Sequence, residues 1–345
     1  MWSLELGASA VSESPRIDRP YRGRLAPSPT GCLHLGHACM FWIAQQRAQE
    51  HSGSLILRNE DLDRSRCKKE FVAAMFEDLR WFGFEWQEGP DCGGPYGPYD
   101  QSERLERYRA ALEKLQTAGF IYPCICSRKD ILDALAAPHE PAPSPVLRPP
   151  SPPSGEREGV RGRYTLPRQA TNDVGPPPER DDEPIYPGTC RSNRKSQIVN
   201  RKFSWRFRVP DGESISFVDG HYGPQQFAAG KDFGDFVVWR HDDMPAYQLA
   251  VVVDDTEMQV TEVVRGADLL LSTARQLLLY RALEWDPPAF YHCPLMTDER
   301  GVRLAKRHDS LSLRALRKQG KTPETLREEW NRESFRPRMD TDQHG

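Results

Sequence analysis

Apolar and polar positions follow one another along this chain with two different periods. In several stretches an apolar residue returns every three or four positions, which is typical of helices that bury one face; these stretches are residues 38–51, 69–82, 102–118 and 269–283. Shorter segments alternate with period two or, like the run 247–253, are apolar throughout, as buried parallel strands are; they are residues 24–26, 54–58, 203–209 and 247–253. Because strands and helices of this size alternate, the pattern predicts an α/β fold with a doubly wound parallel sheet.

One segment interrupts this pattern. Residues 138–184 hold thirteen prolines among serine, glycine and charged residues, with almost no apolar periodicity. Such a composition cannot bury enough apolar surface to offset the entropy lost on ordering, so we expect an insertion without fixed structure. The chain is therefore expected to consist of the first half of an α/β domain, an inserted domain containing this segment, the second half, and a basic loop with a short helical C-terminus: residues 20–118, 119–230, 231–300 and 301–345.

Composition limits the classes of function. The net charge of −3 means that any surface for nucleic acid must be a local patch. The first twenty residues lack the apolar core of a signal peptide, and no uncharged apolar run approaches the roughly 20 residues of a membrane helix. Eight cysteines without an export signal favour free thiols or a metal site over disulfides. We therefore expect a cytoplasmic protein that does not contact a membrane.

The segment 24–37 joins a strand to a helix through a loop suited to phosphate, and it reads RLAPSPTGCLHLGH. Its prolines stiffen the turn, and glycines such as Gly36 allow backbone to approach a ligand closely. The helix is expected to open near Gly36, so its free N–H groups and positive dipole end face the same space as His34 and His37. This pattern indicates a site for a nucleoside triphosphate, although an ordinary Pro/Gly loop remains the alternative.

Three further clusters carry candidate chemistry. Glu60 lies among the acids that follow a strand, where a carboxylate can hold a substrate ammonium group or can simply be a solvated turn residue. Tyr247 begins an apolar run, and Arg265 follows the charged segment after that run; the ordinary role of such a run is structural. The segment GVRLAKRH, residues 301–308, is either an exposed basic loop or a mobile loop that places Lys306 on a phosphate.

The segment 24–37 resembles the HIGH signature of class I aminoacyl-tRNA synthetases, and its wording resembles the glutamyl branch of that class. The resemblance implies a Rossmann-like catalytic domain with ATP bound by His34, Gly36, His37 and Lys306. It implies a glutamate pocket in which Glu60 contacts the amino group; the other members of this pocket are Arg24, Ser28, Tyr247 and Arg265. Because guanidinium binds carboxylate bidentately, two arginines and one acid suit the charges of glutamate, but the sequence leaves open which arginine takes which carboxylate.

The RLAKR segment resembles the second class I signature, KMSKS, with Ala305 in place of serine and Arg303 in place of lysine. Together these motifs imply that the glutamate α-carboxylate attacks the α-phosphorus of ATP, with Mg²⁺, to give glutamyl-adenylate and pyrophosphate. A carboxylate is already a nucleophile, so catalysis requires positioning and charge stabilisation by His34, His37 and Lys306 rather than an acid or base.

A CxC pair and a YxGxC segment, on either side of the proline-rich insertion, supply Cys124, Cys126, Tyr186 and Cys190. Free structural cysteines are the alternative, but this set resembles the three-cysteine, one-tyrosine zinc site of the glutamyl-queuosine tRNA(Asp) synthetases. Only 39 residues follow Lys306 (345 − 306), so we expect no anticodon-binding domain. The glutamyl-queuosine tRNA(Asp) synthetases transfer glutamate to the queuosine base in the anticodon loop of tRNA(Asp). The resemblance thus implies one structural Zn²⁺, queuosine-bearing tRNA(Asp) as partner, and a monomer.

Three alternatives stay open. A short glutamyl-tRNA synthetase that charges a tRNA 3′ end would share every pocket residue. A non-catalytic tRNA-binding relative would not need His34, His37 and Lys306, and a small-molecule nucleotidyltransferase would not need the glutamate pocket.

The stretch 191–208 carries seven basic and no acidic residues, which fits either contact with RNA phosphates or a solvated face of a strand pair.

Overall fold

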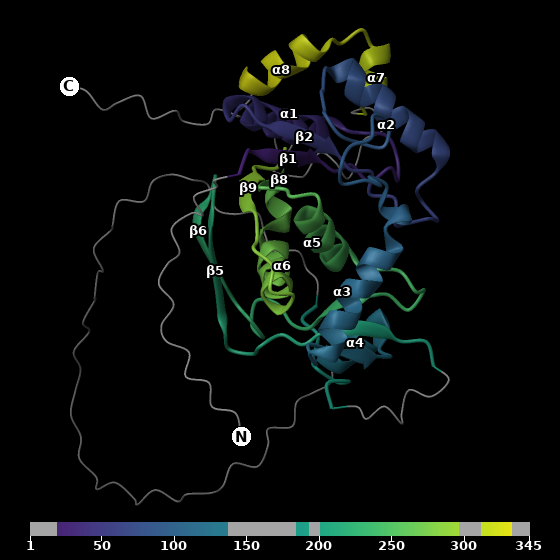
Figure 1. Cartoon of the computed structure of the whole chain (residues 1–345), viewed down its shortest axis with the longest axis vertical. Coiled ribbons are helices and arrows are strands. Elements are labelled where there is room, and N and C mark those ends of the chain that lie inside the picture. The colour runs from purple at the N-terminus through teal and green to yellow at the C-terminus, as the bar shows by residue number, and fades with distance from the viewer. Residues whose placement is uncertain (1–18, 137–183, 193–200, 297–311, 333–345) are drawn as a thin grey trace, which may run out of the picture.

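The computed structural model describes residues 19–136, 184–192, 201–296 and 312–332, and Figure 1 shows their arrangement. The helices are α1 Leu35–Glu50, α2 Lys69–Phe82, α3 Leu105–Thr117, α4 Arg128–Ala136, α5 Tyr247–Glu257, α6 Leu270–Ala282, α7 Leu313–Lys318 and α8 Pro323–Arg332, with short 3-10 turns η1 Gln101–Glu103 and η3 Ala267–Leu269. The strands are β1 Arg22–Leu25, β2 Ser54–Leu57, β3 Ile121–Cys124, β4 Ser204–Phe207, β5 Ser214–Asp219, β6 Gly223–Ala228, β7 Phe236–Trp239, β8 Glu262–Gly266 and β9 Ala289–Cys293.

The described strands form three sheets. β1 and β2 are parallel; β3, β4 and β7 form an antiparallel sheet in that order; and the third sheet has the order β6-β5-β9-β8. Within the third sheet β8 and β5 both run parallel to β9, and β6 returns antiparallel to β5. β1 lies beside β8, because the carbonyl of Arg22 accepts a hydrogen bond from the Thr261 amide at 2.9 Å. The α/β class is confirmed, with parallel pairs divided between two sheets.

The prediction of a buried strand at 247–253 is wrong, since these residues belong to helix α5. Every residue from Leu249 to Asp255 is buried, because α5 lies between other helices and is covered on all sides. A helix that is enclosed in this way is apolar around its circumference, so its sequence shows the unbroken apolar run that a buried strand also shows. The burial was predicted correctly, and the secondary structure was not.

Most other predicted elements differ from the structure only at their ends, and one is divided in two. α2 has the predicted bounds, and it ends where Gly83 adopts a left-handed conformation with φ of 90°. α1 starts at Leu35, one residue before the expected opening at Gly36. The predicted helix 102–118 is split into the turn η1 and the helix α3. The proline-rich segment 138–184 and the loop containing Lys306 lie outside the described residues, apart from Pro184.

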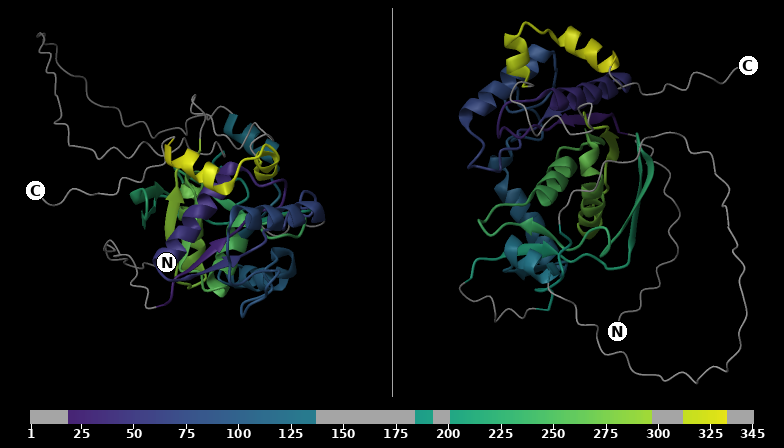
Figure 2. Two further views of the ribbon diagram at one scale, coloured as in Figure 1. Left: turned by 90° about the horizontal axis from the view of Figure 1, so that it is seen from above. Right: turned by 180° about the vertical axis from the view of Figure 1, so that it is seen from behind.

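Three layers follow one another down the long axis in Figure 1. The β1–β2 pair with α1 lies at one end, α5 and α6 lie in the middle beside β8 and β9, and α3 with the antiparallel sheet lies at the other end. Both views of Figure 2 show α7 and α8 against the outer side of the first layer. Among the described residues, no helix combines the length and apolar character needed to span a bilayer.

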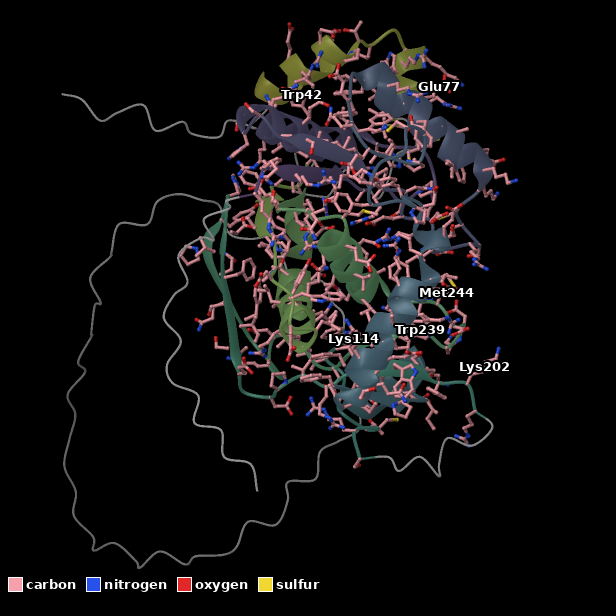
Figure 3. The ribbon with its side chains drawn as sticks, in the orientation of Figure 1. Trp42, Glu77, Lys114, Lys202, Trp239 and Met244 are labelled. Atoms are coloured by element: carbon pink, nitrogen blue, oxygen red, sulfur yellow. The ribbon has the colours of Figure 1, made fainter. Side chains whose placement is uncertain are left out.

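Salt bridges and ring contacts attach the C-terminal helices to the first layer. The Arg327 guanidinium lies 4.3 Å from the ring centre of Trp42 on α1, and Arg314 forms a salt bridge of 2.6 Å with Glu77 on α2. Figure 3 labels Trp42 and Glu77 at these two contacts. The C-terminal helices therefore pack against both α1 and α2.

Candidate active site

The start of α1 presents two histidines around the first turn of the helix. His34 has an extended backbone just before the helix, and His37 lies in the first turn, with 6.0 Å between the two ring centres. The His34 amide donates to Nδ1 of His37 at 3.3 Å, so the proton of a neutral His37 ring is on Nε2. Both residues are half-buried, and a Cβ at Gly36 would meet no atom within 4 Å. Open space, helix N–H groups and imidazole donors thus occur together, as anion binding requires.

Arg24 reaches the same region from the end of β1. Its Nη1 donates to the Val264 carbonyl at 2.8 Å, which ties β1 to β8. Its Nε is buried, lies 3.7 Å from Asp255 Oδ1 and makes no hydrogen bond within the described structure. Burial lowers the pKa of this guanidinium, and the nearby Arg58 adds to that effect while Asp255 opposes it. Ser28 lies on the exposed turn that follows, where its carbonyl accepts from the Thr30 amide.

Glu60 lies next to Arg24 because β1 and β2 are paired in register, Leu25 opposite Leu57. The Glu60 amide donates to the Pro27 carbonyl at 3.0 Å, and its Oε1 accepts from Nη2 of Arg58 at 3.0 Å. Burial raises the pKa of the Glu60 carboxyl above its ordinary value, although Arg58 and Arg24 act against this. The site therefore holds a carboxyl whose charge depends on the neighbouring cations.

Sequence reasoning missed the residue that organises these charges, Arg58. It is fully buried, and its Nη1 donates to Asp255 Oδ1 at 2.6 Å. Asp254 is also buried and accepts hydrogen bonds from Gln101 at 2.8 Å and from Arg104 at 2.6 Å. Apart from Glu60, two residues from Arg58, the partners in these contacts are 150 residues or more apart along the chain, so no local pattern identifies the network.

Arg265 and Tyr247 reach the region of Arg24 and Glu60 from β8 and α5. Arg265, on β8, donates from Nε to His292 Nε2 at 3.1 Å and from Nη2 to Thr273 Oγ1 at 2.6 Å. It forms no salt bridge with any residue in the described ranges. Tyr247, at the start of α5, is 38% exposed, and the charges of Arg265, Glu60 and Arg24 act on its hydroxyl. The structure thus brings the expected pocket residues from β1, β2, α5 and β8 to one region.

Lys306 lies outside the described residues, but the chain resumes close to the histidines. Ser312 forms an antiparallel bridge with His34, and the Leu313 amide donates to the Leu33 carbonyl at 2.8 Å. The C-terminal end of the segment that contains Lys306 is therefore fixed at the start of α1.

A second cluster gathers the four expected metal ligands. The sulfurs of Cys124, Cys126 and Cys190 lie within 4.8 Å of one another. The Tyr186 hydroxyl is 3.4 Å from the Cys124 sulfur and 3.5 Å from the Cys126 sulfur, and the Cys126 and Cys190 sulfurs are 3.4 Å apart. Arg206 donates from Nε to the Cys124 sulfur at 3.3 Å and lies over the Tyr186 ring. The donors converge on one point, with a cation beside them.

The basic stretch 191–208 divides into internal and exposed residues. Arg191 forms a salt bridge of 2.5 Å with Asp235, and Arg206 is buried at the cysteine cluster. Arg201 and Lys202 are exposed, and Figure 3 labels Lys202 at the edge of the molecule. Among the described residues of this stretch, Arg191 and Arg206 therefore have structural partners, whereas Arg201 and Lys202 are exposed.

Comparison with known proteins places this arrangement in a family. A family model described as tRNA synthetases class I (E and Q), catalytic domain, matches residues 21–139 and 168–342. A protein called glutamyl-Q tRNA(Asp) synthetase from Nitratidesulfovibrio vulgaris is 45% identical over 305 residues, or 87% of this chain and 82% of that protein. A protein of the same name from Symbiobacterium thermophilum is 44% identical over 309 residues, or 88% and 83% of the two chains.

Longer relatives match over part of their length. A glutamate–tRNA ligase from Symbiobacterium thermophilum is 37% identical over 88% of this chain but only 56% of its own. The crystal structure of a glutamate tRNA ligase from Elizabethkingia meningosepticum, in complex with its amino acid, has a TM-score of 0.64 and 26% identity, covering 88% of this chain and 54% of that one. The chain therefore belongs to the class I tRNA synthetases (E and Q) and is a ligase of the aminoacyl-tRNA synthetase type.

Proposed function

We propose that the enzyme activates glutamate with ATP and transfers it to the queuosine base of tRNA(Asp). The observation that carries the first half is the convergence of Arg24, Glu60, Tyr247 and Arg265 beside the open start of α1. Glutamate brings two carboxylates and one ammonium group, and buried charges are costly unless they are paired. Two guanidinium groups and one carboxylate supply this pairing.

Each pocket residue has a role in this proposal. Arg265 forms no salt bridge within the described residues, so its charge suits a substrate carboxylate. Arg24 has a buried Nε without a hydrogen-bond partner, which suits the other carboxylate. Glu60 binds the ammonium group, and Ser28 and Tyr247 donate hydrogen bonds. The geometry leaves the assignment of α- and γ-carboxylate to the two arginines open.

ATP occupies the start of α1 in this proposal. The backbone around Gly36 and the Nε2–H of His37 donate to phosphate oxygens, together with His34. Lys306 precedes the His34 contact residue Ser312 by six residues (312 − 306), a span of at most about 20 Å when fully extended. Lys306 would then stabilise the charge on pyrophosphate as the glutamate carboxylate displaces it, and Mg²⁺ bound with ATP would supply further positive charge there.

We also propose that Cys124, Cys126, Tyr186 and Cys190 hold one structural Zn²⁺. Thiolate ligands about 2.3 Å from zinc lie about 3.8 Å apart at the corners of a tetrahedron, and the distances of 3.4–3.5 Å between these donors are close to that value. The Cys190 amide donates to the Tyr186 oxygen at 2.8 Å, which supports a phenolate ligand. Arg206 offsets part of the negative charge of such a ligand set. The site would fasten the inserted domain 119–230.

The acceptor is the part of the proposal that rests on relatives. The two proteins of 44–45% identity are called glutamyl-Q tRNA(Asp) synthetase and match this chain over most of their length. The competing function is that of a short glutamyl-tRNA synthetase, because relatives called glutamate–tRNA ligase match the same residues.

One labelling experiment separates the two. Labelled glutamate, ATP and Mg²⁺ are incubated with tRNA(Asp) containing queuosine, with the same tRNA lacking it, and with tRNA(Glu). Labelling of queuosine-containing tRNA(Asp) alone supports the proposal. Labelling of tRNA(Glu) would replace it with charging of a tRNA 3′ end, and labelling of none would refute both acceptors.

A further inference from the structure

Arg265 is held by a buried chain of side chains that no catalytic role has yet accounted for. Asp219 ends β5, His292 lies in β9, and Arg265 lies opposite His292 on β8. His292 Nδ1 is 2.6 Å from Asp219 Oδ2, and His292 Nε2 is 3.1 Å from Arg265 Nε. The exposed fractions of these residues are 2%, 0% and 5%, so the chain of contacts is shielded from water.

The donors around Asp219 fix where the proton of His292 lies. Asp219 Oδ1 accepts from the backbone amides of His221 at 3.0 Å and Tyr222 at 2.9 Å. Although burial acts in the opposite direction, the His292 contact and these amides hold the pKa of the Asp219 carboxyl below its usual range. Burial lowers the pKa of His292 to about 4. At neutral pH the imidazole is therefore neutral, with its proton on Nδ1 toward Asp219 and Nε2 free to accept from Arg265.

This arrangement has an electrostatic consequence. Arg265 is oriented by neutral acceptors, His292 Nε2, Thr273 Oγ1 and the Leu269 carbonyl, rather than by a carboxylate. The half-buried Arg47, by contrast, is paired directly with the Glu262 carboxylate at 2.6 Å. An acid in direct contact with Arg265 would cancel much of the charge that a substrate carboxylate needs.

We propose that Asp219 and His292 are positioning residues that hold the guanidinium of Arg265 by a neutral acceptor and keep its full charge for a substrate carboxylate. The proposal rests on the proposed function, because it assumes that this carboxylate belongs to glutamate. Asp219 acts at a distance, since it selects the imidazole tautomer that leaves Nε2 without a proton.

The substitution Asp219→Asn tests this role with little change of shape. The backbone amides of His221 and Tyr222 favour an oxygen at the Oδ1 position, where the His292 amide also donates at 3.3 Å, so the new NH₂ group is expected to face His292 Nδ1. Nδ1 then has to accept, the ring proton moves to Nε2, and an N–H of His292 faces the N–H of Arg265. Arg265 loses the acceptor of its Nε and keeps only those of its Nη2, so the guanidinium is held less firmly, although the volume of the core is unchanged.

The experiment compares wild type with Asp219→Asn, His292→Gln and the control Glu262→Gln. Glu262 is a buried carboxylate at the other end of β8, where it contacts Tyr21 and Arg47 and not the pocket. Two-bond ¹H–¹⁵N spectra of the histidine rings report the tautomer of His292, and glutamate-dependent pyrophosphate exchange gives KM for glutamate and for ATP. His292→Gln keeps a neutral oxygen acceptor for Arg265.

We expect the Nδ1–H tautomer in wild type and the Nε2–H tautomer in Asp219→Asn. The KM for glutamate should rise about tenfold or more in that variant, because a hydrogen bond to a charged group is lost, while the KM for ATP stays within about twofold. His292→Gln and Glu262→Gln should both keep a KM for glutamate near that of wild type.

Two results would overturn the proposal: a protonated or Nε2–H His292 in wild type, or an equal rise in KM for Asp219→Asn and the Glu262→Gln control. Wild-type enzyme that shows the expected tautomer but no exchange with glutamate would instead refute the proposed function. The spectra need no substrate, so the two failures are distinguishable.

Discussion

Replacing Arg58 with methionine should destabilise the protein and weaken glutamate binding, and the substitution Asp255→Asn should recover much of both losses. Arg58 contacts Asp255 Oδ1 at 2.6 Å and Glu60 Oε1 at 3.0 Å, and its side chain is 0% exposed. Methionine fills a similar volume without a charge, so two buried carboxylates lose their closest cation. Removing one partner of a buried ion pair costs about 3–5 kcal/mol, because the other charge stays desolvated.

Glutamate binding should weaken for a related reason. Without Arg58, Asp255 has Arg24 as its remaining cation, at 3.7 Å in the present structure. Arg24 would move toward Asp255 and become less available to a substrate carboxylate. The pKa of Glu60 is already raised by burial, and it would rise further without Arg58, so Glu60 would lose charge for the ammonium group. Asp255→Asn removes the competing acid and releases Arg24.

The assay is a double-mutant cycle. Free energies of unfolding come from urea titrations followed by circular dichroism, and KM for glutamate comes from pyrophosphate exchange. The matched control is Arg47→Met, which breaks the pair with Glu262 where the Arg47 side chain is 23% exposed and should cost less. If the losses from Arg58→Met and Asp255→Asn simply add in the double variant, the two residues are not coupled and the reasoning fails.

Three further predictions follow from other parts of the structure. His37→Ala and Lys306→Ala should each reduce pyrophosphate exchange at least about a hundredfold, by loss of phosphate stabilisation; near-wild-type rates in both would refute their roles. Cys124→Ser should lose zinc, measured by metal analysis after dialysis, whereas full retention would exclude the site. Asp78→Asn should raise stability to urea at pH 8 by up to about 3 kcal/mol and by little at pH 4. Burial raises the pKa of the Asp78 carboxyl to about 6 in the folded protein. The folded state is therefore most stable below about pH 4, where this carboxyl is protonated, and it loses stability as pH rises through 6 and the carboxyl ionises. An equal gain at both pH values would contradict this sign.

The sequence predicted best the features that depend on neighbouring residues. The helix α2 shows a clear apolar stripe and a glycine at its end, and its predicted bounds equal the observed ones. The loop before α1 was predicted from a short motif, and the two histidines lie at the helix start as that motif requires. Local patterns carry such features because their physical causes, side-chain periodicity and capping, are local.

Features that depend on distant contacts were not predictable in this way. Arg58 and Asp255 are separated by 197 residues, and His292 and Asp219 by 73. In both pairs, the sequence around one residue gives no sign of which distant residue is its partner. The helix α5 was assigned as a strand for a similar reason, because complete burial removes the polar face that normally reveals a helix.

On the proposed function, the net charge of the buried groups would favour the binding of a second substrate carboxylate in this pocket. Arg104 and the other donors around Asp254 compensate that acid, so it adds little charge to the pocket. On the proposed assignment, the charged groups nearest the substrate are three arginines, Arg24, Arg58 and Arg265, and two acids, Glu60 and Asp255, whereas the Asp219 carboxylate lies behind the neutral His292. They leave one net positive charge, and glutamate carries one net negative charge. A neutral amino acid of the same shape would leave a desolvated guanidinium without a partner, and such a charge is costly. On the proposed function, selectivity for glutamate would therefore arise from the buried charges as a group rather than from the two arginines alone.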